Sequence, residues 1–278
     1  MQLGVRAHDV GSNEFEPLVS KMHHLGFTCT QLAPKKAIGN FPVKDSCLTP
    51  GMASYMKKVF RREEVDVAVL GCYLNLATPN EEELTKNLAT YKTYIRFASA
   101  LSCGVVGTET GAINEKYEYE ERNHSIEALE IFIQNLKPVV AYAEKMGVIF
   151  GIEPVYKHIV CNVERANYVL KAIDSPNLQI IFDPVNLLSE HNYHLQDQIL
   201  EEAFSLLKDD IAVIHLKDFV VENNRIKSAS LGKGLTNFKK ILQFIKEEKP
   251  YIQVLLEDTK PMDVIESREY LEKLYQSL

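Results

Sequence analysis

GVIFGIEPVYKH, residues 147–158, holds an apolar run that ends on an acid. Residues 148–152 are Val, Ile, Phe, Gly and Ile, a composition typical of a strand that is covered on both faces. Glu153 and Pro154 follow at once and end the run. One such strand would mean little by itself, but the same pattern recurs three more times downstream.

Short apolar runs alternate with longer amphipathic stretches along the whole chain. The runs are rich in Val, Ile and Leu and mostly lack polar alternation, as expected of strands in a parallel sheet. They occupy residues 2–7, 27–32, 65–71, 105–109, 148–152, 178–182, 211–215 and 252–256.

Helix signals lie between these runs. Asn13 and Asn80 are each followed three residues later by a glutamate, which is capping-box spacing. Thr49 precedes a proline, an order typical of a helix start. Apolar residues at helical spacing predict helices over residues 125–146, with Gly147 as the C-cap, and over residues 262–274.

The alternation of strands and helices predicts an α/β fold. Eight strand–helix units in 278 residues make a (β/α)8 TIM barrel, with residues 1–278 as a single domain. A doubly wound open sheet is the alternative. Its glycine-rich first turn is missing, because residues 8–12 read HDVGS rather than G-x-G-x-x-G.

Composition argues against several classes of protein. The net charge is −7 and no basic run is longer than a pair, so we expect no nucleic-acid partner. The five cysteines lack C-x-x-C spacing, which favours free thiols over a zinc ribbon or a redox dithiol. The first ten residues do not resemble a signal peptide, and no apolar run reaches the roughly 20 residues of a membrane helix. We therefore expect a cytoplasmic enzyme without membrane contact.

Metal-competent side chains follow or end the last four strand candidates. The carboxyl ends of barrel strands converge on the axis, so the sequence predicts four metal ligands there: Glu153, Asp183, His215 and Glu257. This set suits one divalent ion, with Mn²⁺ preferred over Mg²⁺, Co²⁺ or Zn²⁺. Any single position could also be only the point where a strand meets water. Three acids crowded together without a cation would, however, repel one another.

The motifs around these residues carry a family resemblance. The strings GIEP (151–154), FDPVN (182–186), IHLKD (214–218) and LLED (255–258), with the turn LGKGLTNF (231–238), resemble the xylose isomerase-like barrel superfamily. Within it the chain is most similar to sugar isomerases and epimerases of the D-tagatose 3-epimerase kind. Inosose dehydratase and endonuclease IV are more distant relatives. Endonuclease IV is disfavoured as a functional guide, since its additional metal-binding histidines are missing here.

The resemblance implies an activity. Glu153, Asp183, His215 and Glu257 match the family's metal ligands, and the family's two glutamates also transfer protons, which makes Glu153 and Glu257 the expected catalytic residues. The substrate would be a small sugar or polyol derivative in carbohydrate metabolism. A carboxylate that moves a proton next to a metal-held carbonyl performs epimerisation or isomerisation. An inosose-dehydratase-like lyase and a non-catalytic sugar-binding barrel are the alternatives.

Two positions depart from the epimerase pattern. Asn186 stands where the epimerases carry a substrate-contacting histidine, and Lys217 lies near the place of an arginine. Both are predicted to bind substrate. Arg225 would take the arginine's role only if the intervening loop folds back. The substrate, its phosphorylation state, the native metal and the presence of a homo-oligomer stay open.

Polar residues after the first four strands complete the predicted substrate pocket. Arg6, buried in a strand end, needs partners, and Glu109 is the expected one. The turn Gly232–Gly234 could cradle an anion, although a plain loop turn is favoured. The pocket candidates, for each of which a structural role is an equal alternative, are Arg6, His8, Gln31, Tyr73, Asn75 and Glu109.

Overall fold

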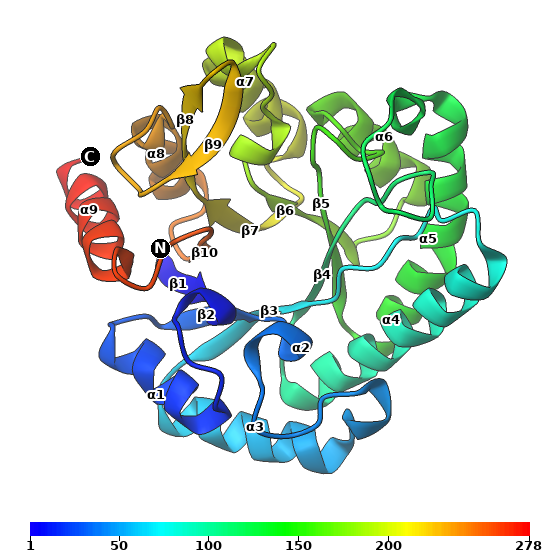
Figure 1. The fold of residues 1–278 in the computed structure, drawn as a ribbon, viewed down its shortest axis with the longest axis horizontal. Helices are drawn as coiled ribbons and strands as arrows, with labels where there is room; N and C mark the ends of the chain where they lie inside the picture. The colour runs from blue at the N-terminus through cyan, green and yellow to red at the C-terminus, as the bar shows by residue number, and fades with distance from the viewer.

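The fold is a closed barrel of eight parallel strands, seen along its axis in Figure 1. The computed structural model describes all 278 residues. The predicted (β/α)8 barrel is confirmed, and every predicted strand is present with bounds that shift by at most two residues. Around the barrel the order is β1 (Gln2–Arg6), β10 (Gln253–Leu256), β7 (Ile211–Leu216), β6 (Leu178–Phe182), β5 (Ile149–Glu153), β4 (Val105–Glu109), β3 (Asp66–Gly71) and β2 (Cys29–Leu32).

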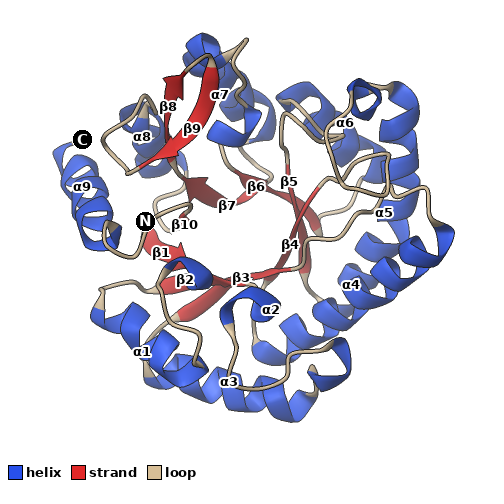
Figure 2. Cartoon of the chain, in the orientation of Figure 1, coloured by secondary structure: helices blue, strands red, loops and turns tan.

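Helices form a ring outside the strands (Figure 2). None of them is both long and apolar enough to cross a membrane. They are α1 (Phe15–His24), α2 (Pro34–Ala37), α3 (Pro50–Arg62), α4 (Glu81–Leu101), α5 (Ile126–Met146), α6 (Val163–Ile173), α7 (Gln196–Leu207), α8 (Phe238–Glu248) and α9 (Val264–Ser277).

Most of the expected helix caps form. The side chains of Thr49 and Asn80 accept hydrogen bonds from backbone N–H groups in the first turns of α3 and α4. The expected cap at Asn13 is wrong, because α1 begins only at Phe15. The carbonyl of Asn13 instead accepts the Gly39 N–H at 2.7 Å, and Asn40 Oδ1 accepts the Phe15 N–H at 3.2 Å. A contact with a distant loop therefore replaces the local cap.

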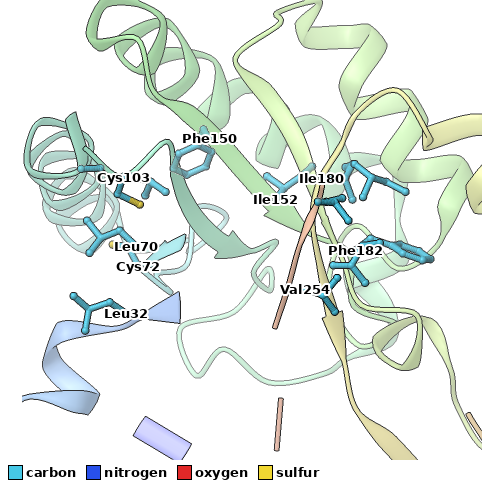
Figure 3. Packing of buried hydrophobic residues seen from close by; sticks show 14 of the residues in the cluster. Leu32, Leu70, Cys72, Cys103, Phe150, Ile152, Ile180, Phe182 and Val254 are labelled. Carbon is cyan, nitrogen blue, oxygen red and sulfur yellow. The ribbon is translucent and has the colours of Figure 1, made fainter. Parts of the chain in front are cut away.

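The barrel interior is filled by its own small apolar cluster. Ile181 lies where two neighbours have no side chain, since a Cβ at Gly107 or Gly151 would come within 2.6 or 2.9 Å of it. A larger apolar layer joins the outer faces of the strands to the helices, and part of it is drawn in Figure 3. The interior cluster consists of Cys29, Ala68, Val69, Val105, Ile181, Val213 and Leu255. These apolar layers leave the carboxyl ends of the strands for polar side chains.

An antiparallel hairpin, absent from the sequence prediction, extends beyond β7. Its strands are β8 (Asp218–Glu222) and β9 (Arg225–Ala229), joined through Asn223 and Asn224 with φ of 51° and 56°. Two adjacent residues with positive φ are typical of the tight turn that suits hairpin twist. Figure 1 shows the hairpin, in yellow and orange, beside α7 and α8.

The glycine turn after the hairpin does bind an anion, but the anion belongs to the protein. Asp218 is buried, and its Oδ2 accepts the Gly232 N–H at 2.9 Å and the Gly234 N–H at 2.8 Å. Its Oδ1 accepts the N–H groups of Phe219 and Thr236. A Cβ at Gly234 would lie 2.3 Å from the Phe219 carbonyl oxygen, so the backbone approaches closely only with glycine here. The turn therefore ties both ends of the hairpin segment to one carboxylate.

Candidate metal centre

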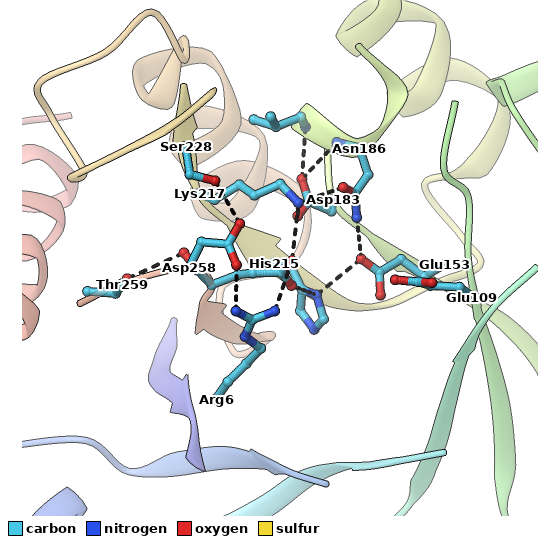
Figure 4. A network of polar contacts seen from close by, with 12 residues as sticks. Arg6, Glu109, Glu153, Asp183, Asn186, His215, Lys217, Ser228, Asp258 and Thr259 are labelled. Atoms are coloured by element: carbon cyan, nitrogen blue, oxygen red, sulfur yellow. Dashed lines mark hydrogen bonds and ion pairs between the residues drawn. The ribbon is translucent and has the colours of Figure 1, made fainter. Parts of the chain in front are cut away.

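Four side chains gather at the carboxyl end of one wall of the barrel, and Figure 4 labels three of them, Glu153, Asp183 and His215. Glu153 ends β5, Asp183 follows β6, His215 lies within β7 and Glu257 follows β10. Each offers one nitrogen or oxygen atom, and these atoms lie within 4.8 Å of one another. All four residues are buried. The residues that the sequence predicted as ligands are thus brought together by four neighbouring parallel strands.

The polar atoms of this cluster fit a divalent cation. His215 Nε2 has no hydrogen bond although the side chain is completely buried, whereas His215 Nδ1 lies 2.8 Å from Glu257 Oε2. The second oxygen of Asp183, Oδ2, lies 3.1 Å from the ammonium of Lys217. The first oxygen of Asp183, Oδ1, accepts the N–H groups of Val185 at 2.8 Å and Asn186 at 3.1 Å, which fixes the carboxylate. Buried polar atoms without partners are costly, and an ion held by them would remove that cost. One imidazole and three carboxylates suit Mn²⁺, Co²⁺ or Zn²⁺, and to a lesser degree Mg²⁺.

Lys217 lies inside the ligand group. Its Nζ is 3.1 Å from Asp183 Oδ2 and 3.1 Å from Glu257 Oε1, and it donates to Asn186 Oδ1 at 2.5 Å. Burial opposes the charge, but the carboxylates outweigh it and hold the pKa of Lys217 above its ordinary value. Asn186 in turn donates to Glu153 Oε1 at 2.6 Å. One chain of contacts therefore runs from Glu257 through Lys217 and Asn186 to Glu153.

Arg6 contacts the same cluster from the next strand. Its Nη1 lies 3.1 Å from Glu257 Oε1, its Nε 2.9 Å from Asp9 Oδ2, and its Nη2 2.6 Å from Asp258 Oδ1. The expected pairing with Glu109 is wrong. β1 pairs with β10 when the barrel closes, so Arg6 meets the acids after β10, whereas Glu109 ends β4 on another part of the barrel.

The charges shift the pKa values of the cluster in opposite directions. Burial raises the pKa of Glu257, but Lys217 and His215 reverse this and hold it well below the ordinary value. Burial raises the pKa of Asp183 to about 6. Burial lowers the pKa of His215, yet Glu153 and Glu257 raise it overall to about 10. Without a metal, the imidazole therefore carries a proton at neutral pH.

Glu109 forms a second acidic group beside the first. It pairs in register with Glu153 on the neighbouring strand, and burial followed by the charges of Glu153 and Glu257 raises its pKa to about 7. The Tyr117 hydroxyl donates to Glu109 Oε2 at 3.3 Å, and His158 Nδ1 lies 3.7 Å from the same oxygen. Sequence reasoning missed His158, although it ends the stretch that revealed Glu153.

The remaining predicted pocket residues lie on the β1–β3 side. His8 Nε2 is 3.9 Å from Asp9 Oδ1, and its buried Nδ1 has no hydrogen bond. The Gln31 amide donates to the Tyr73 hydroxyl, which leaves Gln31 Oε1 buried without a partner. These two orphaned atoms suit a role in ligand binding.

Asn75 is a loop brace rather than a pocket residue. Its amide donates to the carbonyls of Ala112 and Asn114, and its oxygen accepts the N–H groups of Ala77 and Ala112. With every polar atom of the amide used, the side chain ties the loop after β3 to the loop after β4. The substrate-binding alternative for Asn75 is wrong for this reason.

A cavity of about 410 Å³ opens beside the centre, and both Lys217 and Asn186 line it. Its volume falls within the range of about 300–1,000 Å³ that is typical of small-molecule sites. The metal-competent cluster therefore has room for a reactant next to it.

Comparisons with known proteins show which family the chain belongs to. The chain is 25% identical over 231 residues to an uncharacterized protein of Methanocaldococcus jannaschii, covering 81% of this chain and 75% of that protein. It is 24% identical over 151 residues to a probable L-ribulose-5-phosphate 3-epimerase of Mycoplasma pneumoniae, covering 54% of this chain and 47% of that protein.

Among solved structures, a D-tagatose 3-epimerase-like protein superimposes with a TM-score of 0.79 and 22% identity, over 100% of this chain and 98% of that one. At this identity the likeness concerns the fold alone. A family model described as xylose isomerase-like TIM barrel matches residues 19–274. Nearly the whole chain is covered by this match, and the chain therefore belongs to the xylose isomerase-like TIM barrel family.

Proposed function

We propose that this chain is a divalent-metal-dependent isomerase or epimerase that acts on a small sugar or sugar derivative. The gathering of Glu153, Asp183, His215 and Glu257 beside a cavity supports the proposal most directly. Sugar epimerases among the similar proteins agree with it. We further propose Mn²⁺ as the ion, a place in carbohydrate metabolism, and residues 1–278 acting as one cytoplasmic domain.

The proposed chemistry divides between the ion and the chain. A divalent ion at this centre would supply Lewis acidity that polarises a carbonyl and a neighbouring hydroxyl, which makes the adjacent C–H acidic. Glu153 and Glu257 would hold the ion and move the proton, one residue taking it and either the same or the other returning it. Asn186 orients Glu153 through Oε1 and leaves Oε2 without a hydrogen bond in the protein, ready to accept a proton. Lys217, which lines the cavity, would stabilise negative charge that develops on the substrate oxygens.

Solvent deuterium tests this proposal. In D₂O, the Mn²⁺-loaded protein should introduce deuterium at a carbon next to the carbonyl of its ketose or aldose without net loss of water. Glu153→Gln and Glu257→Gln should each lower the exchange rate by at least about a hundredfold, since general acid–base catalysis contributes about 10²–10⁴-fold. Glu127→Gln, at an exposed position on α5, is the matched control and should exchange at the normal rate. Normal exchange in either active-centre variant would refute the paired roles.

A lyase is the second candidate, because one observation favours it. Burial and the neighbouring charge of Glu153 raise the pKa of Glu109 to about 7, so a substantial share of this carboxyl group carries a proton at neutral pH and could donate it to a departing hydroxyl. A lyase would form an unsaturated product that absorbs in the ultraviolet. An isomerase or epimerase gives deuterium incorporation with no such absorbance, so a single incubation separates the two.

A further inference from the structure

The cavity beside the metal centre has walls from three successive barrel loops. The residues after β5 form one wall, those after β6 the second, and the β8–β9 hairpin the third. Asn186 and Lys217 lie at its inner end, where they touch the metal-competent carboxylates. Arg225 lines the outer part together with Lys157, so the loop after β7 does fold back over the site. A ligand in this cavity would extend from the metal centre toward these two cations.

One of the two acids in the cavity wall is already neutralised. Asp258 Oδ1 accepts from Arg6 Nη2 at 2.6 Å, and Asp258 Oδ2 accepts from the Ser228 hydroxyl at 2.7 Å. Glu190 is then the remaining acid that lines the cavity. Little negative charge is left in the cavity to balance its cations.

The cations of the outer wall have no such partners. Lys157 and Arg225 are exposed, come from different loops and form no ion pair in the protein. Lys227, on the same hairpin as Arg225, does pair with Glu222 at 2.8 Å. Two unpaired cations facing one cavity in a chain of net charge −7 form a local surplus of positive charge.

The charges at the inner end of the cavity are close to balance once a divalent ion is bound. The two charges of a divalent ion and that of Lys217 balance the three carboxylate charges of the centre, because the charge of Arg6 is already shared with Asp9 and Asp258. The imidazole is counted as neutral, as metal binding requires. The loaded centre therefore does not cancel the positive charge that Lys157 and Arg225 place at the rim of the cavity.

We infer that the cavity selects a sugar with an anionic group, a phosphate ester or a carboxylate, at the end remote from the reacting carbonyl. Lys157 and Arg225 bind that group, because a guanidinium and an ammonium make strong charge-assisted hydrogen bonds to such oxygens. The aromatic ring of Tyr156 and the apolar side chain of Ile226 line the same cavity and can cover the carbon skeleton. This inference names the substrate class of the proposed isomerase or epimerase and rests on that function.

Binding affinities for the Mn²⁺-loaded protein test the inference, because they compare ligands whether or not each is turned over. Isothermal titration with D-ribulose 5-phosphate, D-ribulose and a ketonic sugar acid of similar length compares one skeleton with and without an anion. We expect at least one of the two anionic ligands to bind at least about tenfold more tightly than D-ribulose, as one charge-assisted hydrogen bond can provide. Whichever binds more tightly identifies phosphate or carboxylate as the recognised group. Added salt should weaken the binding of the anionic ligand and leave the binding of D-ribulose unchanged.

Charge-removing variants locate the binding group. Lys157→Gln and Arg225→Gln should each weaken the anionic ligand by about tenfold and change D-ribulose binding by less than about twofold. Arg61→Gln is the matched control: Arg61 is also exposed and lines a cavity, but with Val65 and Asp66 at the opposite end of the barrel. It should bind every ligand as the unmodified protein does.

Two outcomes would overturn the inference. One is D-ribulose binding as tightly as both anionic ligands, and the other is unchanged binding of the anionic ligand in both cavity variants. The proposed function fails separately: anionic binding without any deuterium exchange would refute the isomerase while keeping the recognition site. Deuterium exchange with neutral sugars alone would refute the anion-recognition site and keep the proposed isomerase or epimerase.

Discussion

At the scale of single residues, Lys217 places a positive charge among three carboxylates. Its ammonium contacts Asp183 and Glu257 directly and Glu153 through Asn186. In the absence of a metal it is a counter-ion that keeps the acids together. Removing one partner of a buried charge pair costs about 3–5 kcal/mol.

Lys217→Met should therefore destabilise the metal-free protein and make it more dependent on an ion. Unfolding monitored by calorimetry in a chelator should show a loss of about 3 kcal/mol. Saturating Mn²⁺ should restore a larger part of the stability than it adds to the unmodified protein, because the ion then replaces a missing cation. Lys171→Met, at an exposed position on α6, is the control for the same side-chain change. Equal melting temperatures for both variants in the chelator would contradict the counter-ion role.

The residue scale also shows what sequence could and could not reveal about the site. The four metal-competent residues were predictable, because strand ends can be recognised from apolar runs and parallel strands end on one side. The partners of Arg6 were not, since the contact between β1 and β10 forms only on closure and joins residues 252 positions apart. His158 lay in plain view, but its approach to Glu109 depends on how the loop after β5 turns.

At the scale of elements, the β8–β9 hairpin and its anchor decide the shape of the cavity. Asp218 accepts four backbone N–H groups, two of them from Gly232 and Gly234. Buried backbone donors that lose their acceptor carry the full cost of desolvation. The hairpin that bears Arg225 therefore depends on one carboxylate.

Asp218→Asn should loosen the hairpin without unfolding the barrel. The amide group keeps one acceptor oxygen but turns an NH₂ toward backbone donors, so we expect a loss of about 2 kcal/mol and local opening. Hydrogen exchange should accelerate at the amides of Gly232 and Gly234, and limited proteolysis should cut first near residues 223–224. Asp209→Asn, at an exposed position, should change neither measurement. Unchanged protection of the two glycine amides would show that the carboxylate does not hold the turn.

The elements differ in how far sequence predicts them. Barrel strands carry dense runs of Val, Ile and Leu, and all eight were located from that signal. The two hairpin strands are half polar and five residues long, so their sequences cannot be distinguished from that of an ordinary loop. The start of α1 was misplaced because the Asn40 side chain, distant in sequence, replaces the local cap.

At the scale of the whole molecule, the metal centre links four neighbouring strands of the barrel wall. An ion bound only by the folded chain stabilises it by mass action, by about 2.7 kcal/mol at a hundredfold excess over Kd. Protons compete with that ion, because the ring of His215 must lose its proton to bind. Metal stabilisation must therefore depend on pH.

The direction of this pH dependence follows from the pKa of His215, which is raised to about 10 in the folded metal-free protein. The charged ring stabilises that protein fully below the ordinary pKa of about 6.5, and this contribution is lost as the pH rises toward 10. Asp183, with a pKa of about 6, acts in the same direction at lower pH. The stabilisation by the metal ion therefore increases as the pH rises, because fewer protons compete with the ion for the His215 ring.

We therefore expect the gap in melting temperature between the Mn²⁺-loaded and chelator-treated protein to widen from pH 6.5 to pH 8.5. Thermal unfolding at each pH measures this gap, and titration in two buffers with different ionisation heats measures the proton released. In His215→Gln the pH dependence should largely disappear, which serves as the control. A gap that stays constant with pH, with no proton release, would contradict metal binding through this imidazole.

Ile181, which fills the space left open by Gly107 and Gly151, affects how small molecules reach and leave the site. Together with its apolar neighbours it fills the interior of the barrel, so small molecules cannot pass through the barrel from one end to the other. Reactant and product must therefore both enter and leave the site from the side of the carboxyl ends of the strands. Any loop that covers this end of the barrel would slow the release of product as well as the entry of substrate.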